Sequence, residues 1–188
     1  MKGFSKNILI RLLFIATPLL LLLSGYIYDH PLDDDAKQKT VVKIKTVFLY
    51  NFAKNIEWPQ GYKEGNFVIG VMGNNVALLS ELNNLAQNKS IGTQPLEIKS
   101  YASVSNIGKC HMLYVLPENS SSLSELVGKL KGKSTLIVAE KPGSAKQGAV
   151  INFVIQDNKQ KFELNKASAQ KYNLKISNNL ATLAIVVE

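Results

Sequence analysis

The sequence contains few of the residues on which catalysis and metal binding most often depend. Its 188 residues include one cysteine, Cys110, and two histidines, His30 and His111. A single cysteine excludes an internal disulfide. Zinc sites take three or four protein ligands, which the one cysteine and one histidine of the expected folded region do not supply. We therefore predict no metal site, no cofactor and no catalytic residues, and we expect that the protein is not an enzyme.

Cys110 and His111 are adjacent, so a nucleophile paired with a base was the one catalytic arrangement to consider. They open a short apolar run that is typical of a strand. Neighbouring side chains in a strand point to opposite faces, so these two cannot easily share a proton. We therefore favour a packing role for both residues.

Arginine is almost absent. The chain carries 22 basic and 14 acidic side chains, a net charge of +8, yet Arg11 is its one arginine. Arginine is the preferred residue for bidentate contacts to phosphates and guanine, and here it lies outside the expected fold. We therefore predict no nucleic-acid partner.

The N-terminus has the pattern of an export segment. Lys2 and Lys6 precede an apolar run that ends near Ser24-Gly25, which predicts a signal peptide over residues 1–25. No clean A-x-A cleavage site is present, and residues 8–28 are long enough to remain as an inner-membrane anchor. Both interpretations place the rest of the chain outside the cytoplasm. The segment 1–25 holds three basic residues and no acidic ones, so the remainder carries +5 of the charge.

The acidic, polar stretch that follows predicts a linker over residues 26–37, and the folded domain is expected over residues 38–188. That domain opens on a helical pattern with one broad apolar face. Apolar residues recur there at steps of three or four: Val41, Ile44, Phe48, Phe52 and Ile56. Trp58-Pro59 ends the pattern, because the residue before a proline disfavours the helical conformation.

Short apolar runs then alternate with helical patterns as far as residue 139, which predicts a largely parallel sheet with helical crossovers. A hairpin with its turn at Asp157-Asn158 predicts an antiparallel edge. We therefore predict an α/β fold, a three-layer α/β/α sandwich around a mixed, mostly parallel sheet of about six strands. The predicted strands are 67–72, 94–100, 111–116, 135–139, 149–156 and 160–164, and the closing helices are 165–173 and 178–187.

The turn Gly73-Asn74-Asn75 follows a predicted strand and opens a predicted helix. A helix N-terminus in that position can hold a small anion. The spacing G-x-G-x-x-G is missing, so an ordinary turn in which Asn75 caps the helix is the stronger interpretation. We keep Gly73, Asn74 and Asn75 as candidate ligand-binding residues.

Aromatic residues are concentrated between residues 48 and 58, at Phe48, Tyr50, Phe52 and Trp58. One helical face cannot turn all four inward. We expect Phe48 and Phe52 in the core, whereas Tyr50 and Trp58 could line a groove, since aromatic side chains favour binding surfaces.

The segment Phe48–Pro59, FLYNFAKNIEWP, also resembles the opening signature of the YfiR family of periplasmic proteins. The resemblance extends over about residues 40–188. Its further segments are 67–73, 110–115, 148–153, 162–165, 176–177 and 180–184, together with Ala169 and Leu174.

The resemblance implies one exported, often dimeric α/β domain without known catalytic activity. Its best-known members bind the periplasmic sensor region of a membrane-bound diguanylate cyclase and hold it inactive. An outer-membrane lipoprotein relieves that repression, so that cyclic di-GMP and biofilm formation rise. Other members occur beside sensor kinases, and the alternative function for this chain is a periplasmic small-molecule-binding module that serves such a kinase.

We take the partner-binding candidates from the aromatic cluster and from the closing segment: Tyr50, Trp58, Pro59, Phe162 and Leu180. The sequence departs from the family pattern in one respect. Well-studied members carry disulfides, and one of their cysteines aligns with Cys110. The position expected for its partner falls near Val71, so this chain lacks the bridge.

Overall fold

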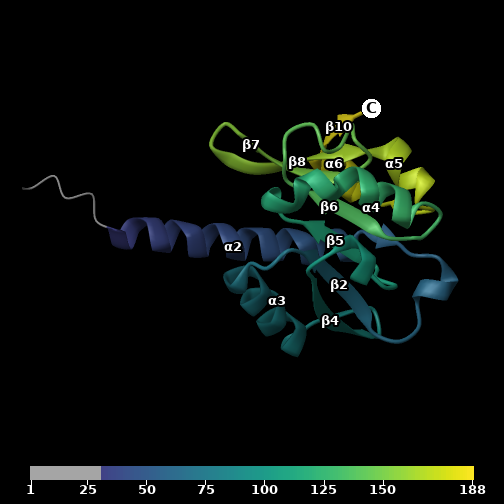
Figure 1. Ribbon diagram of the computed structural model, residues 1–188, viewed down its shortest axis with the longest axis horizontal. Coiled ribbons are helices and arrows are strands. Elements are labelled where there is room, and N and C mark those ends of the chain that lie inside the picture. Colours follow the sequence, from purple (N-terminus) through teal and green to yellow (C-terminus); the bar gives the residue numbers. More distant parts are fainter. Residues whose placement is uncertain (1–30) are drawn as a thin grey trace, which may run out of the picture. The chain divides into compact units, whose positions relative to one another are not determined.

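The computed structural model describes residues 31–188, shown in Figure 1. The predicted signal or anchor segment and His30 lie outside the described residues. The chain divides into two compact units, 1–38 and 39–188, and the second unit contains the sheet. Within residues 31–188, no helix is both long and apolar enough to cross a membrane.

The first described element is helix α2 (Pro31–Lys54). It begins inside the segment that composition assigned to a linker, so the part from Pro31 to Lys37 is helical. Proline is tolerated in the first turn of a helix, because the N–H that it lacks has no partner there. The acidic, proline-containing composition of this stretch was therefore not enough to predict a linker without helix.

The central sheet has eight strands in the order β10-β8-β7-β6-β5-β2-β4-β3. The inner strands from β7 to β4 are all parallel, and β7 and β8 form the antiparallel hairpin. This confirms the predicted α/β fold with a mostly parallel sheet. The strands are β2 (Phe67–Met72), β3 (Ser90–Ile91), β4 (Gln94–Tyr101), β5 (Met112–Val115), β6 (Leu136–Ala139), β7 (Ile151–Gln156), β8 (Lys159–Asn165) and β10 (Ile185–Val187).

Helices join the parallel strands. Helix α3 (Val76–Asn88) connects β2 to β4, and α4 (Leu123–Leu130) connects β5 to β6. Each buries leucines against the sheet, Leu78 and Leu82 in α3 and three more in α4. Two short helices, α5 (Lys166–Lys171) and α6 (Asn178–Leu183), follow the hairpin. The 3-10 turns are η1 (Gln60–Tyr62), η2 (Val104–Asn106) and η3 (Pro117–Ser122).

Two local features agree with the sequence analysis. Asp157 and Asn158 have φ values of 53° and 55°, which is the left-handed pair that a two-residue hairpin turn requires. The Asn75 side chain accepts a hydrogen bond from the backbone N–H of Leu78 at 2.9 Å and caps α3. Asparagine and aspartate tolerate the left-handed conformation of the hairpin turn, and the asparagine side chain can cap a helix. Both properties depend only on neighbouring residues.

The buried face of α2 differs from the predicted one. Phe52 and Ile56 are in the core as expected, but Val41 and Ile44 are exposed and Phe48 is only partly buried. Apolar residues of α2 form two stripes that are one residue apart, one through Val41 and Phe48 and one through Val42 and Leu49. Periodicity alone does not decide which stripe is buried. The residues of this helix and its end that the structure buries are Val42, Thr46, Leu49, Phe52, Ala53 and Ile56.

The C-terminal prediction was wrong in its last residues. A helix was expected over 178–187, but α6 ends at Leu183 and Ile185–Val187 forms strand β10, parallel to β8. These β-branched residues favour the extended backbone when a sheet edge is available. A small antiparallel pair, β1 (Ile56–Glu57) with β9 (Lys175–Ile176), was not predicted.

Candidate functional site

Trp58 is buried in the core, and it also lines a surface hollow. Its side chain is 5% exposed, and its indole N–H donates to the carbonyl of Ala53 at 3.4 Å. The rings of Phe67 and His111 meet it edge to face, with centroids at 5.3 Å and 5.6 Å. Trp58, four residues after the last residue of α2, therefore packs against the start of the sheet.

His111 uses both ring nitrogens to hold backbone groups. Its Nδ1 accepts the N–H of Val68 at 3.0 Å, and its Nε2 lies 2.7 Å from the carbonyl oxygen of Tyr62. An accepting Nδ1 assigns the proton to Nε2, which then donates to Tyr62. Burial lowers the pKa of the imidazole, the Tyr62 carbonyl opposes that shift, and the nearby charge of Lys109 adds to it. The ring is therefore a neutral structural group.

This environment predicts a pH dependence of stability. The folded-state pKa of His111 lies below its unfolded value, so the unfolded chain binds a proton first as the pH falls. Stability contributed by the neutral ring is complete above about pH 6.5 and is lost as the pH falls toward the folded pKa. Urea unfolding between pH 7.5 and pH 5 (about two units around the free histidine pKa) should show this decline. The variant H111Q should show a shallower decline, and an equal one would contradict the assignment.

Cys110 is also a core residue. Its side chain is fully buried, and burial raises the pKa of the thiol to about 11, against the lowering effect of a hydrogen bond with Thr135. The nucleophilic form of cysteine is the thiolate, which this site disfavours. Cys110 and His111 thus do not form a nucleophile and base pair. No group of three or more potential metal-ligating side chains comes together within residues 31–188.

Two surface hollows meet at Asn55, where α2 ends. The first measures about 500 Å³ and has Trp58, Ile91 and Ile176 among its lining residues. The second measures about 310 Å³ and lies between α2 and α6, with Phe52, Phe162 and Leu180 in its lining. Asn55 lines both. These hollows lie where the two ends of the domain come together.

Asn55 fixes this junction by hydrogen bonds to Ser177. The Ser177 hydroxyl donates to Oδ1 of Asn55 at 3.1 Å, and the Ser177 N–H donates to the Asn55 carbonyl at 3.0 Å. The same hydroxyl accepts the N–H of Leu180 at 3.1 Å and caps α6. We call this pair the Asn55–Ser177 link. Asn55 was quoted within the family signature, but nothing in its neighbourhood predicted a contact 122 positions away.

The predicted partner-binding residues occupy different environments. Phe162 and Leu180 are brought together in the second hollow, and Trp58 lines the first, but each is no more than 5% exposed. Tyr50 is partly buried with its hydroxyl 3.4 Å from the Ser90 carbonyl, and Pro59 is exposed. Of the five, Pro59 and Tyr50 offer surface to a partner in this conformation. The interaction surface stays a prediction.

Leu183 was not among the candidates, although it is 74% exposed and lines the second hollow. The sequence pattern placed Leu183 on the same helical face as Leu180. In the structure α6 ends at Leu183 and a strand follows, and Leu183 is exposed beside the second hollow. Sequence periodicity could not show where α6 ends.

The turn after β2 is tightly packed. Gly73 has a φ of +109°, and a Cβ at this position would come within 2.1 Å of Oδ1 of Asn119. Both facts require glycine here. The N–H of Gly73 donates to the Tyr101 carbonyl at 3.0 Å, and Asn75 is occupied in capping α3. Ligand binding by Gly73, Asn74 and Asn75 stays a prediction, and the geometry accounts for Gly73 and Asn75 structurally.

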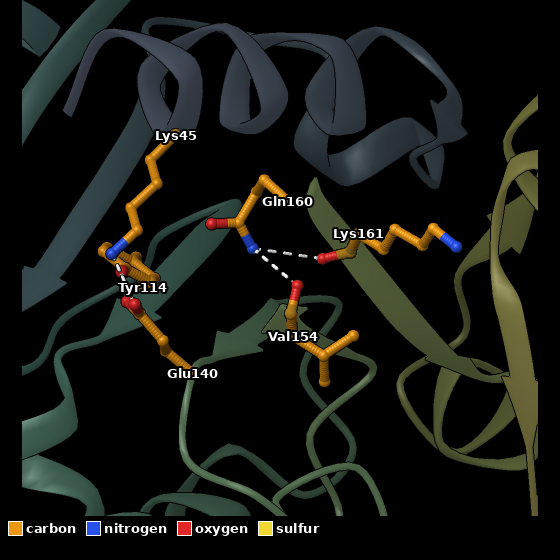
Figure 2. A network of polar contacts seen from close by, with 6 residues as sticks. All are labelled: Lys45, Tyr114, Glu140, Val154, Gln160 and Lys161. Atoms are coloured by element: carbon orange, nitrogen blue, oxygen red, sulfur yellow. Dashed lines mark hydrogen bonds and ion pairs between the residues drawn. The ribbon is translucent and has the colours of Figure 1, made fainter. Parts of the chain in front are cut away.

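A polar network joins α2 to the carboxyl edge of the sheet. Lys45 of α2 forms an ion pair with Glu140, whose second oxygen accepts the hydroxyl of Tyr114, as Figure 2 shows. Burial raises the pKa of Tyr114, and the neighbouring Glu140 carboxylate raises it further. Gln160 lies beside this group and donates to the carbonyls of Val154 and Lys161 at 3.0 Å and 3.2 Å. The network fastens the middle of α2 to β5 and β6.

Replacing Glu140 with glutamine is expected to destabilise the domain. The side chains of Lys45 and Glu140 are 17% and 21% exposed, so the remaining ammonium would be largely buried without a counter-charge. We expect a loss of about 1–3 kcal/mol in the free energy of unfolding. Urea denaturation checks it. The double variant K45M/E140Q should lose less than the sum of the two single variants, and strict additivity would contradict the pairing.

The described part of the chain is an α/β sandwich that buries Cys110 and His111 and has two surface hollows beside the Asn55–Ser177 link. The profile of the YfiR/HmsC-like family matches residues 42–185. The chain therefore belongs to the YfiR/HmsC-like family, and the resemblance of the signature segments is confirmed.

Solved structures agree with the fold. A conserved domain protein from Vibrio cholerae O1 biovar El Tor is similar to this chain, with a TM-score of 0.54 and 12% sequence identity. The match covers 78% of this chain and 60% of that chain, so this chain spans less than two thirds of that chain. A likeness at this identity shows the fold alone. No curated protein matched the sequence.

Proposed function

We propose that this chain is an exported, non-enzymatic regulator that binds the periplasmic sensor region of an inner-membrane signalling protein and represses it. The partner we propose is a diguanylate cyclase, so the protein would control cyclic di-GMP and biofilm formation. Membership of the YfiR/HmsC-like family over residues 42–185 carries the proposal. In this proposal residues 1–25 export or anchor the chain, and residues 38–188 are the regulatory domain. A homodimer, and release of repression by an outer-membrane lipoprotein, belong to the same proposal.

The structure supports a binding role through its chemistry. The thiol of Cys110 and the ring of His111 are held in the core by structural contacts. The apolar side chain of Leu183 is 74% exposed and lines the second hollow, whose other lining residues include Phe48 and Phe162. Such surfaces are suited to a protein partner.

The experiment uses a membrane cyclase encoded next to this chain. Its periplasmic region, purified separately, is titrated with the full chain by isothermal calorimetry. The proposal predicts a saturable complex. A matched periplasmic region from an unrelated sensor should give none. Equal signals from the two regions, or none from either, would remove the proposal.

A second candidate function is a periplasmic small-molecule-binding module that serves a sensor kinase. The hollow of about 500 Å³ beside Trp58 favours it, because its volume falls in the range of small-ligand sites. A ligand at 100 times its dissociation constant should add about 2.7 kcal/mol to the stability. A thermal-shift panel of metabolites tests this candidate, and a panel without any shift counts against it.

A further inference from the structure

Helix α2 has an exposed apolar face opposite the one that it buries. Val41, Ile44 and Val47 are 42%, 39% and 54% exposed and lie three positions apart, on one side of the helix. We call these three residues the α2 face. Single exposed apolar residues are ordinary, whereas a contiguous row of them marks an interaction site.

The α2 face continues into a groove between α2 and α3. The groove measures about 390 Å³, and Val47 belongs both to it and to the α2 face. Thr46 also lines it: the residue is 4% exposed, and its buried Oγ1 has no hydrogen-bond partner. A buried hydroxyl without a partner is unusual in a folded protein. The other lining residues are Lys43, Glu81, Asn84, Leu85, Asn88 and Lys89.

The charges around this surface are mostly positive. From Ala36 to Ile56 the sequence has five lysines and no acidic residue. Lys45 turns inward to Glu140, but Lys39 and Lys43 are exposed next to the α2 face, and Lys89 lies on the other rim of the groove. Glu81 is the single acidic residue among those that line the groove. An occupant with carboxylates beside apolar side chains would match both the charge and the apolar surface.

We infer that the α2 face and the adjoining groove dock an acidic amphipathic helix from the periplasmic region of the regulated sensor. A groove between two helices accepts the apolar side of a third helix, and the lysines at its rim pair with that helix's carboxylates. This inference rests on the proposed function for the identity of the partner. It adds the surface that is used and the chemistry of the segment that binds there.

The test compares variants of the full chain in binding to the purified periplasmic region of the neighbouring cyclase. V47E and K43E each place a carboxylate against the acidic helix, so we expect each to weaken binding about tenfold. I155E is the matched control, because Ile155 is a β-branched residue that is 68% exposed on strand β7. It should leave affinity unchanged. Wild-type affinity should also fall as salt is raised, and the salt dependence of K43E should be smaller.

The remaining outcomes separate the inference from the proposed function. If the wild type and both α2 variants bind equally well, the inference fails and the proposed function stands. If the wild type does not bind, both fail.

A change of molar mass in light scattering for V47E would assign the face to a second copy of the chain. Lysine-dependent binding of the wild type to vesicles of anionic lipid would assign it to a membrane, and a lowered melting temperature of V47E would assign it to the chain's own packing. Each of these results overturns the inference.

Discussion

Replacing Phe52 with alanine is expected to cost about 3–5 kcal/mol of the free energy of unfolding, which is a large part of the stability of a domain of this size. The Phe52 ring is completely buried in α2. It packs against Phe162 at 4.9 Å, Phe153 at 5.6 Å and Phe48 at 5.7 Å between ring centroids. Truncation leaves a cavity among rings that come from the helix and from both arms of the hairpin, and these cannot all move inward to fill it.

Equilibrium urea unfolding followed by circular dichroism measures this loss. V47A is the matched control, since Val47 lies on the same helix and is 54% exposed. It should change the free energy of unfolding by no more than about 0.5 kcal/mol. Similar losses for F52A and V47A would mean that α2 does not pack through the face that the structure buries.

The second large effect is expected for His111. The variant H111A leaves the N–H of Val68 and the carbonyl of Tyr62 without their side-chain partner. It also removes a ring that stacks on Phe67 with centroids 4.3 Å apart. The Tyr62 carbonyl keeps its second hydrogen bond, from Gln94 Nε2 at 3.1 Å, so the unsatisfied group is the Val68 N–H. This group, the lost bond to Tyr62 and the cavity together should cost about 3–5 kcal/mol.

Hydrogen exchange can locate this effect. In H111A the amide of Val68 should exchange faster than in the wild type by more than the global loss of stability explains. The variant H111Q keeps a side chain able to accept and to donate, so it should be destabilised less than H111A. Equal losses in both variants would show that ring packing, and not the two hydrogen bonds, accounts for the role of His111.

What the sequence predicted correctly is mainly local. The strand Phe67–Met72, the cap at Asn75 and the hairpin turn at Asp157-Asn158 depend on residues within a few positions of one another. Alternation of strands and helices was enough for the α/β class, because parallel neighbours need a crossover.

What it missed depends on distant partners. The register of α2 is set by the ring cluster with Phe153 and Phe162, residues more than a hundred positions away that periodicity within one helix does not see. Strand β10 exists because the edge of β8 is free to pair with Ile185–Val187. Trp58 was expected to line a groove and it does line the first hollow, but its burial against Phe67 and His111 was not predicted.

The same limit applies to the candidate site. Phe162 and Leu180 were chosen separately, and the structure brings them into one hollow. The Asn55–Ser177 link joins two polar residues, and their residue types alone do not predict that they pair. Leu183 is exposed where α6 ends, and Val47 is exposed because α2 buries a different face. Neither fact could be predicted from the sequence pattern.

The central claim is repression of a membrane cyclase by this domain, and the rate of cyclic di-GMP synthesis tests it most directly. The full-length neighbouring cyclase is placed in lipid nanodiscs, where both sides of the membrane are accessible, and is assayed with and without a saturating amount of the full chain. The account predicts that the protein lowers the rate severalfold, whereas chain unfolded by heating has no effect. Equal rates with and without the folded protein would contradict it.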